Sequence, residues 1–152
     1  MNGLLIANKD QAARQLMAAA FQESGYRITT TDSVLNALEK ILEKSIQVVL
    51  LGGSLDEQHI AKFVPLLKKC NRNLSIILIA DEMPLDLLRK IRKEGIFYHA
   101  LKPAADEGWD EIRQAVNCAF ENYHQHLNAR PKLFGRKMPI RAARSLLTSL
   151  TF

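Results

Sequence analysis

Short apolar runs alternate with amphipathic stretches along this chain. Four consecutive apolar residues at Val48–Leu51 are followed by Gly52 and Gly53, a pattern typical of a strand that is buried on both faces of a parallel sheet. Runs of similar length recur on either side of it. We therefore predict five strands, at Leu4–Ala7, Tyr26–Thr29, Val48–Leu51, Ser75–Ala80 and Phe97–Leu101.

The stretches between these runs have the spacing of helices with one apolar face. Asp10 and Ser33 stand where N-caps of the first two helices belong, and Gly25 and Gly95 stand where the first and fourth end. The fifth helix is the longest and is expected to run to about Asn128. Strand and helix alternating five times predicts an α/β fold, a doubly wound parallel sheet with helices on both faces.

A second, smaller part follows the fifth helix. We expect a body at residues 1–128 and a basic extension at 129–152, because Arg130-Pro131 breaks the helix and 130–138 have the composition of a linker. Pro139 suits the first turn of a further short helix. One face of that helix would carry the tail contacts, at Ile140, Ala143, Leu146, Leu147 and Leu150.

Composition indicates a water-soluble protein of ordinary size. The 152 residues are 47% hydrophobic and 24% charged. The longest apolar stretch falls well short of the ~20 residues of a membrane span, and the N-terminus lacks a basic segment, so a cytoplasmic location is expected. The two cysteines, Cys70 and Cys118, follow helical apolar patterns and are expected to be reduced thiols.

Charge is unevenly placed along the chain. Beyond residue 125 there is no acidic residue, and the cations there exceed the net charge of +5. They are Arg130, Lys132, Arg136, Lys137, Arg141 and Arg144. Three interpretations of this tail remain open: docking of its apolar face on a subunit or partner, disorder in isolation, and contact with nucleic acid or an anionic membrane.

The first four fifths of the chain resemble the receiver domain of two-component response regulators, including the chemotaxis regulators. Leu4–Asp10 resembles the family's first strand and its acidic end, and Val48–Leu55 resembles the strand that carries the phosphorylated aspartate. Ile76–Ala80 resembles the fourth strand. Gly95–Pro103 resembles the family's Gly…Lys-Pro segment. The resemblance implies a flavodoxin-like strand order of 2-1-3-4-5.

The resemblance also implies a phosphorylation pocket, and this chain departs from it. The family's nucleophilic aspartate falls on Gly52, and its acidic, Mg²⁺-binding pair falls on Asn8 and Lys9. The phosphate-binding hydroxyl falls on Ile79, and only the lysine, at Lys102, survives. Glycine has no atom to phosphorylate, and an amide beside an ammonium is a poor magnesium site. We therefore expect a degenerate pocket, with neither enzymatic activity nor a cofactor.

A receiver without an acceptor is expected to act by binding other signalling proteins. His99 falls where receivers keep a switching side chain. The family's signalling face, made by the fourth helix, fifth strand and fifth helix, has mixed charge here and suggests a homodimer. Its charged residues are Arg89, Lys90, Arg92, Lys93, Glu107 and Glu111.

Three alternatives belong to other functional classes. An active response regulator would need an unusual acceptor, for which Ser54 and Asp56 are the nearest candidates, although both suit helix caps. A flavodoxin-like enzyme or nucleotide-binding protein would need a phosphate-binding loop after the first strand, which residues 7–11 do not supply. A DNA-binding regulator would use the basic tail.

Overall fold

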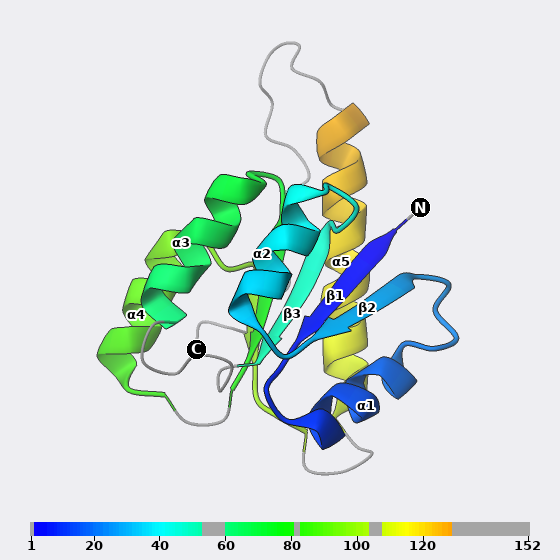
Figure 1. Cartoon of the computed structure of the whole chain (residues 1–152), viewed down its shortest axis with the longest axis horizontal. Helices are drawn as coiled ribbons and strands as arrows, with labels where there is room; N and C mark the ends of the chain where they lie inside the picture. The colour runs from blue at the N-terminus through cyan, green and yellow to red at the C-terminus, as the bar shows by residue number, and fades with distance from the viewer. Residues whose placement is uncertain (1, 53–59, 81–82, 104–107, 129–152) are drawn as a thin grey trace.

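The structure is a computed structural model that describes residues 2–52, 60–80, 83–103 and 108–128 (Figure 1). Strands and helices alternate throughout the described part. The strands are β1 (Gly3–Ala7), β2 (Arg27–Thr31), β3 (Val48–Gly52), β4 (Ser75–Ile79) and β5 (Tyr98–Ala100). The helices are α1 (Gln11–Ala20), α2 (Val34–Leu42), α3 (Ile60–Cys70), α4 (Leu85–Glu94) and α5 (Trp109–Asn128). The predicted extension at 129–152 lies outside the described residues.

All five strands are parallel and stand in the order β2-β1-β3-β4-β5, which confirms the predicted order. Ala7 pairs with Leu51, Gly52 with Ile79, and Ile79 with Ala100. The last residues of the strands therefore form one row across the sheet. That row sets the edge at which ligands bind in folds of this kind.

Two layers of helices cover the sheet, with α1 and α5 on one face and α2, α3 and α4 on the other (Figure 1). Side chains alternate between the layers along each strand. In β1, Leu4 and Ile6 pack toward α1 and α5, while Leu5 and Ala7 pack toward the other three helices. Burial on both faces explains why the central strands are uninterrupted apolar runs.

The strands at the two edges differ from their predicted ranges. β2 spans Arg27–Thr31 rather than Tyr26–Thr29, because its pairing follows β1 up to Thr31 opposite Ala7. Tyr26 precedes the strand, and its ring packs 4.5 Å from that of Phe120 in α5. β5 holds only Tyr98–Ala100, two residues fewer than its apolar run, since it pairs with β4 alone.

Most of the predicted helix signals are confirmed, but α1 ends at Ala20 with Phe21 as its C-cap, so Gly25 does not end this helix. The Asp10 carboxylate accepts a hydrogen bond from the Ala13 amide at 3.2 Å, and the Ser33 hydroxyl accepts one from the Asn36 amide at 3.3 Å. Gly95 ends α4 in the left-handed conformation, with φ of 103°, which glycine adopts without strain. None of the helices in the described part of the chain combines the length and apolarity needed to cross a bilayer.

Candidate functional site

The candidate site is the edge of the sheet at which the strands end. Asn8 follows β1, Gly52 ends β3, and Lys102 lies two residues beyond β5. The structure therefore brings the predicted pocket residues of β1 and β3 together at the centre of the sheet. Asn8 is buried, whereas Lys9 and Lys102 are exposed.

Asn8 fills the space beside Gly52. A Cβ atom built on Gly52 would lie 2.5 Å from the Asn8 Nδ2 atom and 2.8 Å from its Cγ atom. The Asn8 Oδ1 atom accepts a hydrogen bond from the Asp10 amide at 2.9 Å, which orients the side chain. The space beside Gly52, the position predicted to correspond to the acceptor, is therefore not open. A neighbouring amide occupies it.

Arg14 is a residue of this edge that the sequence analysis missed. Its Nη1 atom donates hydrogen bonds to the carbonyl oxygens of Asn8 at 2.7 Å and Lys9 at 3.1 Å. The guanidinium therefore holds the loop between β1 and α1 from the first turn of the helix. The sequence contained a sign of this contact. A long side chain four residues after the N-cap Asp10 points back toward the loop that precedes the helix.

Within the described residues, two acidic residues follow strands at this edge: Asp10 after β1 and Asp32 directly after β2. Asp10 is the nearest in sequence to Asn8, but its carboxylate caps α1. No group of three or more His, Cys, Asp or Glu residues in the described ranges is placed to hold a metal ion. Mg²⁺ requires hard anionic oxygens in octahedral geometry, and the amide of Asn8 and the ammonium of Lys9 do not supply them.

Ile79 ends β4 at this edge, but its side chain points into the core. It is 4% exposed and packs in the cluster formed with α1 and α5. The next residue, Ala80, is half-buried and packs toward the opposite layer. Neither side chain carries an oxygen, so neither offers a hydroxyl to a phosphoryl group.

His99 connects the ends of β4 and β5. Its Nε2 atom lies 3.1 Å from the carbonyl oxygen of Ala80. The ring is half-buried, and it projects from the side of β5 opposite to Tyr98 and Ala100. The predicted switch position therefore contacts the backbone directly beyond β4.

The predicted partner surface is formed by α4, β5 and α5. Arg89, Lys90, Arg92 and Lys93 are all exposed on α4, and Glu111 is exposed on α5. Two leucines at the same end of the sheet are also exposed: Leu85 at the start of α4, 60% exposed, and Leu101 after β5, 64% exposed. The Tyr98 hydroxyl donates a hydrogen bond to Glu111 and so fixes one acidic group of this surface.

Several predicted positions lie outside the described residues. They are Glu107 of the partner surface, the alternative acceptors Ser54 and Asp56, and the tail contacts Ile140, Ala143, Leu146, Leu147 and Leu150.

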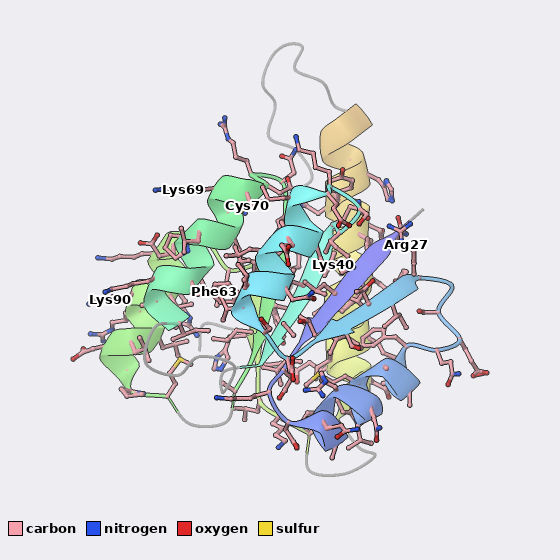
Figure 2. All side chains as sticks on the ribbon, viewed as in Figure 1. Arg27, Lys40, Phe63, Lys69, Cys70 and Lys90 are labelled. Atoms are coloured by element: carbon pink, nitrogen blue, oxygen red, sulfur yellow. The ribbon has the colours of Figure 1, made fainter. Side chains whose placement is uncertain are left out.

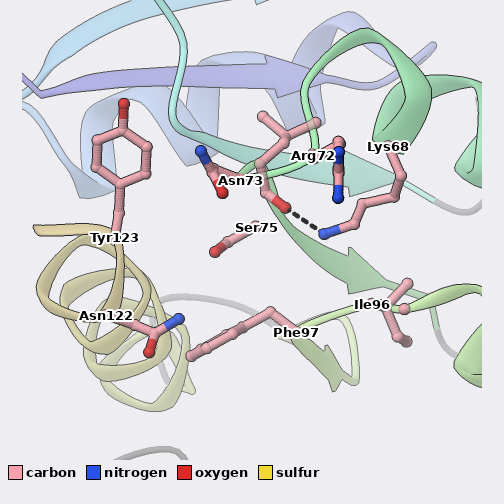
Figure 3. Close-up of a pocket in the computed structure, with 10 residues that line it drawn as sticks. Lys68, Arg72, Asn73, Ser75, Ile96, Phe97, Asn122 and Tyr123 are labelled. Carbon is pink, nitrogen blue, oxygen red and sulfur yellow. Dashed lines mark hydrogen bonds between the residues drawn. The ribbon is translucent and has the colours of Figure 1, made fainter. Parts of the chain in front are cut away.

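A hollow of about 270 Å³ lies at the opposite edge of the sheet, where β4 and β5 begin (Figure 3). Lys68 and Arg72 line it together with Asn122 and Tyr123 of α5. The Lys68 ammonium donates a hydrogen bond to the Leu74 carbonyl oxygen at 2.8 Å, and burial lowers its pKa. This contact joins the end of α3 to the start of β4 and accounts for the position of Lys68 without a ligand.

Comparison with protein-family models identifies one family. A family model described as the response regulator receiver domain matches residues 4–117. No curated protein sequence matches the chain. Among solved structures, a beryllofluoride-activated NtrC4 receiver domain dimer matches with a TM-score of 0.71 and 22% identity, covering 81% of this chain and 99% of that one.

Two further structures show the same fold. A response regulator receiver domain protein from Clostridium thermocellum matches with a TM-score of 0.71 and 20% identity, over 82% of this chain and 98% of that one. The signal receiver domain of a LuxO-type repressor from Vibrio parahaemolyticus matches with a TM-score of 0.74 and 14% identity. That match covers 85% of this chain and 97% of the other. At these identities the likeness concerns the fold alone.

Proposed function

Because this chain belongs to the response regulator receiver domain family, we propose that it is a receiver that signals by binding other proteins without being phosphorylated. One observation carries the proposal. The acceptor position is Gly52, and the amide of Asn8 occupies the space into which a side chain at that position would extend.

The chemistry of phosphoryl transfer supports this proposal. An aspartate would have to attack the phosphoryl donor, and Mg²⁺ would have to neutralise the charge that develops. Gly52 carries no nucleophile, and Asn8 and Lys9 replace two carboxylates by a neutral and a positive group. Arg14 adds a second cation to the same loop. Restoring a single residue would therefore not restore the reaction.

A receiver of this kind would not be switched by phosphate. Phosphorylation in the family biases an equilibrium between two states of the signalling face. Without an acceptor, the chain would hold one state, in which His99 contacts the Ala80 carbonyl oxygen beside β4. Partners would then recognise a constitutive surface.

We assign partner binding to the surface of α4, β5 and α5. It combines exposed leucines, Leu85 and Leu101, with cations on α4 and Glu111 on α5. Apolar groups surrounded by charges of both signs are typical of surfaces that bind proteins, and opposite charges on one surface allow two copies to pair around a two-fold axis. A homodimer or another signalling protein is the partner that this surface favours.

Amide chemical shifts test the proposal directly. We expect beryllofluoride with Mg²⁺ to leave the amide resonances of Asn8, Gly52 and Lys102 unchanged. The positive control is the triple variant Asn8→Asp, Lys9→Asp, Gly52→Asp, which restores the three carboxylates together and should respond. Saturable shifts at this edge in the unmodified chain would refute the proposal.

A further inference from the structure

Three leucines are exposed along the outer side of the contact between α2 and α3. Leu35 and Leu42 of α2 are 68% and 58% exposed, and Leu66 of α3 is 47% exposed. The two helices are neighbours in the same layer (Figure 1). Leucines exposed to this extent on adjacent helices form an apolar surface for which the described chain provides no cover.

Helix geometry places these leucines across from one another. Figure 2 shows Phe63 and Cys70 on the side of α3 nearer to α2, and Leu66 shares that side because it is three residues from Phe63 and four from Cys70. Figure 2 also shows Lys40 on the side of α2 away from α3. Leu35 and Leu42, seven residues apart, lie roughly 140–160° around α2 from Lys40, which places them on the side toward α3. We call this surface the α2–α3 groove.

We propose that the α2–α3 groove binds the apolar stripe of the chain's own C-terminal segment, residues 139–150. That stripe consists of Ile140, Ala143, Leu146, Leu147 and Leu150, and it needs a surface against which to be buried. A helix of twelve residues is about 18 Å long, close to the length of about 16 Å expected for the eleven residues of α3.

The connecting segment is long enough for the proposed contact. α5 and α3 both run back from the ends of their preceding strands, so their C-terminal ends lie at the same end of the sheet (Figure 1). Residues 129–138 span up to about 35 Å when extended. The path from the α5 layer across the sheet to the α3 layer is roughly 20 Å, or two layer spacings of about 10 Å.

Charge favours one direction of binding. Glu39 and Glu43 are exposed on α2, whereas α3 exposes Lys62 and Lys69 and has no acidic residue. In the proposed helix, Arg144 borders one side of the stripe. Ala142 and Ser149, which are uncharged, border the other.

A helix that enters the groove from the end where α5 stops would run antiparallel to α2 and α3. In that direction Arg144 lies on the side of α2, beside Glu39 and Glu43, and the uncharged side lies over the lysines of α3. The opposite direction would place Arg144 over Lys62 and Lys69.

Crosslinking tests the proposal on the full chain. In a Cys70→Ser, Cys118→Ser background, we pair Leu147→Cys with Leu42→Cys and treat the protein with a short bismaleimide. The control pair joins Leu147→Cys with Lys40→Cys, on the other side of α2. We expect a crosslink within one chain for the first pair and little for the control. Glu39→Cys serves as a second reporter on α2, and it leaves every leucine of the groove in place. We expect it also to be crosslinked to Leu147→Cys.

Other outcomes would overturn the proposal. Equal crosslinking at positions 40 and 42, or none at 39 and 42, would show that residues 139–150 do not occupy the groove. A crosslink that joins two chains on a denaturing gel would assign the groove to a second copy instead. Leu146→Asp with Leu150→Asp should abolish the crosslink, whereas Ser145→Asp, which leaves the stripe intact, should preserve it.

Discussion

The side-chain amide of Asn8 and the backbone of Gly52 lie so close that a Cβ atom at residue 52 would be 2.5 Å from the Asn8 Nδ2 atom. The two positions are therefore coupled. A side chain returned to position 52 must displace Asn8, whose Oδ1 atom accepts the hydrogen bond of the Asp10 amide. The absence of a side chain at residue 52 and the position of the Asn8 amide are therefore parts of one arrangement.

This coupling predicts a non-additive pair of substitutions. Gly52→Ala should lower the free energy of unfolding by about 1–3 kcal/mol, because the new methyl group overlaps the Asn8 amide. Asn8→Ala should recover part of that loss when combined with it, as urea denaturation of the four proteins of the double-mutant cycle would show.

Gly3 provides the control for this cycle. A Cβ atom at Gly3 would meet the backbone carbonyl oxygen of Ser45, which cannot rotate away as a side chain can. Gly3→Ala should therefore destabilise the chain whether or not Asn8 is replaced. Additive effects of Gly52→Ala and Asn8→Ala would contradict the proposed coupling.

Arg14 is expected to stabilise the loop after β1. Arg14→Met removes two hydrogen bonds to backbone carbonyl oxygens but keeps an unbranched side chain on the helix, so it should cost about 1 kcal/mol of unfolding free energy. The matched control is Gln15→Met, at an exposed position of the same helix. Equal losses for the two variants in urea denaturation would show that the carbonyl contacts contribute nothing.

The raised pKa of Tyr26 leads us to expect a loss of stability at alkaline pH. Burial raises the pKa of the phenol above 10.0, and nearby Glu121 acts in the same direction, while the hydroxyl donates a hydrogen bond to Asn117. When a group has a higher pKa in the folded than in the unfolded state, its contribution to stability is complete below the unfolded-state pKa. That contribution is lost as the pH rises through the folded-state pKa.

The measurement compares the wild type with Tyr26→Phe in urea, at neutral pH and above pH 10. The excess stability of the wild type should be constant up to about pH 10 and should shrink beyond it. An excess that grows above pH 10 would contradict the assignment.

The α4, β5 and α5 surface predicts self-association. Sedimentation at increasing concentration should show a monomer–dimer equilibrium, and Leu101→Asp should shift it toward the monomer, because a charge replaces an exposed apolar contact. Leu16→Asp is the control, since Leu16 is 48% exposed on α1, away from this surface. If the wild type stays monomeric at high micromolar concentration, the homodimer hypothesis is wrong.

The sequence predicted the fold because the apolar runs of the central strands follow directly from burial on both faces. Val48–Leu51 and Ile76–Ile79 are fully or almost fully buried, and no other element type fits such short runs between helical patterns. The edge strands were less predictable. Tyr26 appeared to belong to the second strand, but its ring packs on α5 before the strand begins.

The candidate site, like the fold, was predicted only in part from the sequence. The resemblance to receiver domains, together with the residue types at Asn8, Lys9 and Gly52, led to the prediction of a degenerate pocket. They did not predict that Asn8 fills the space at Gly52 or that Arg14 binds the loop, because both depend on side-chain directions in the folded chain. Ile79 ends β4 at this edge, and only the structure shows that its side chain is packed in the core.

The central claim is that this receiver accepts no phosphoryl group. The most direct test is the intact mass of the full, unmodified chain after incubation with acetyl phosphate and Mg²⁺, with the triple variant Asn8→Asp, Lys9→Asp, Gly52→Asp treated in parallel. We predict no mass gain for the unmodified chain. A gain of one phosphoryl group that depends on Mg²⁺, mapped to any of its residues, would contradict the account.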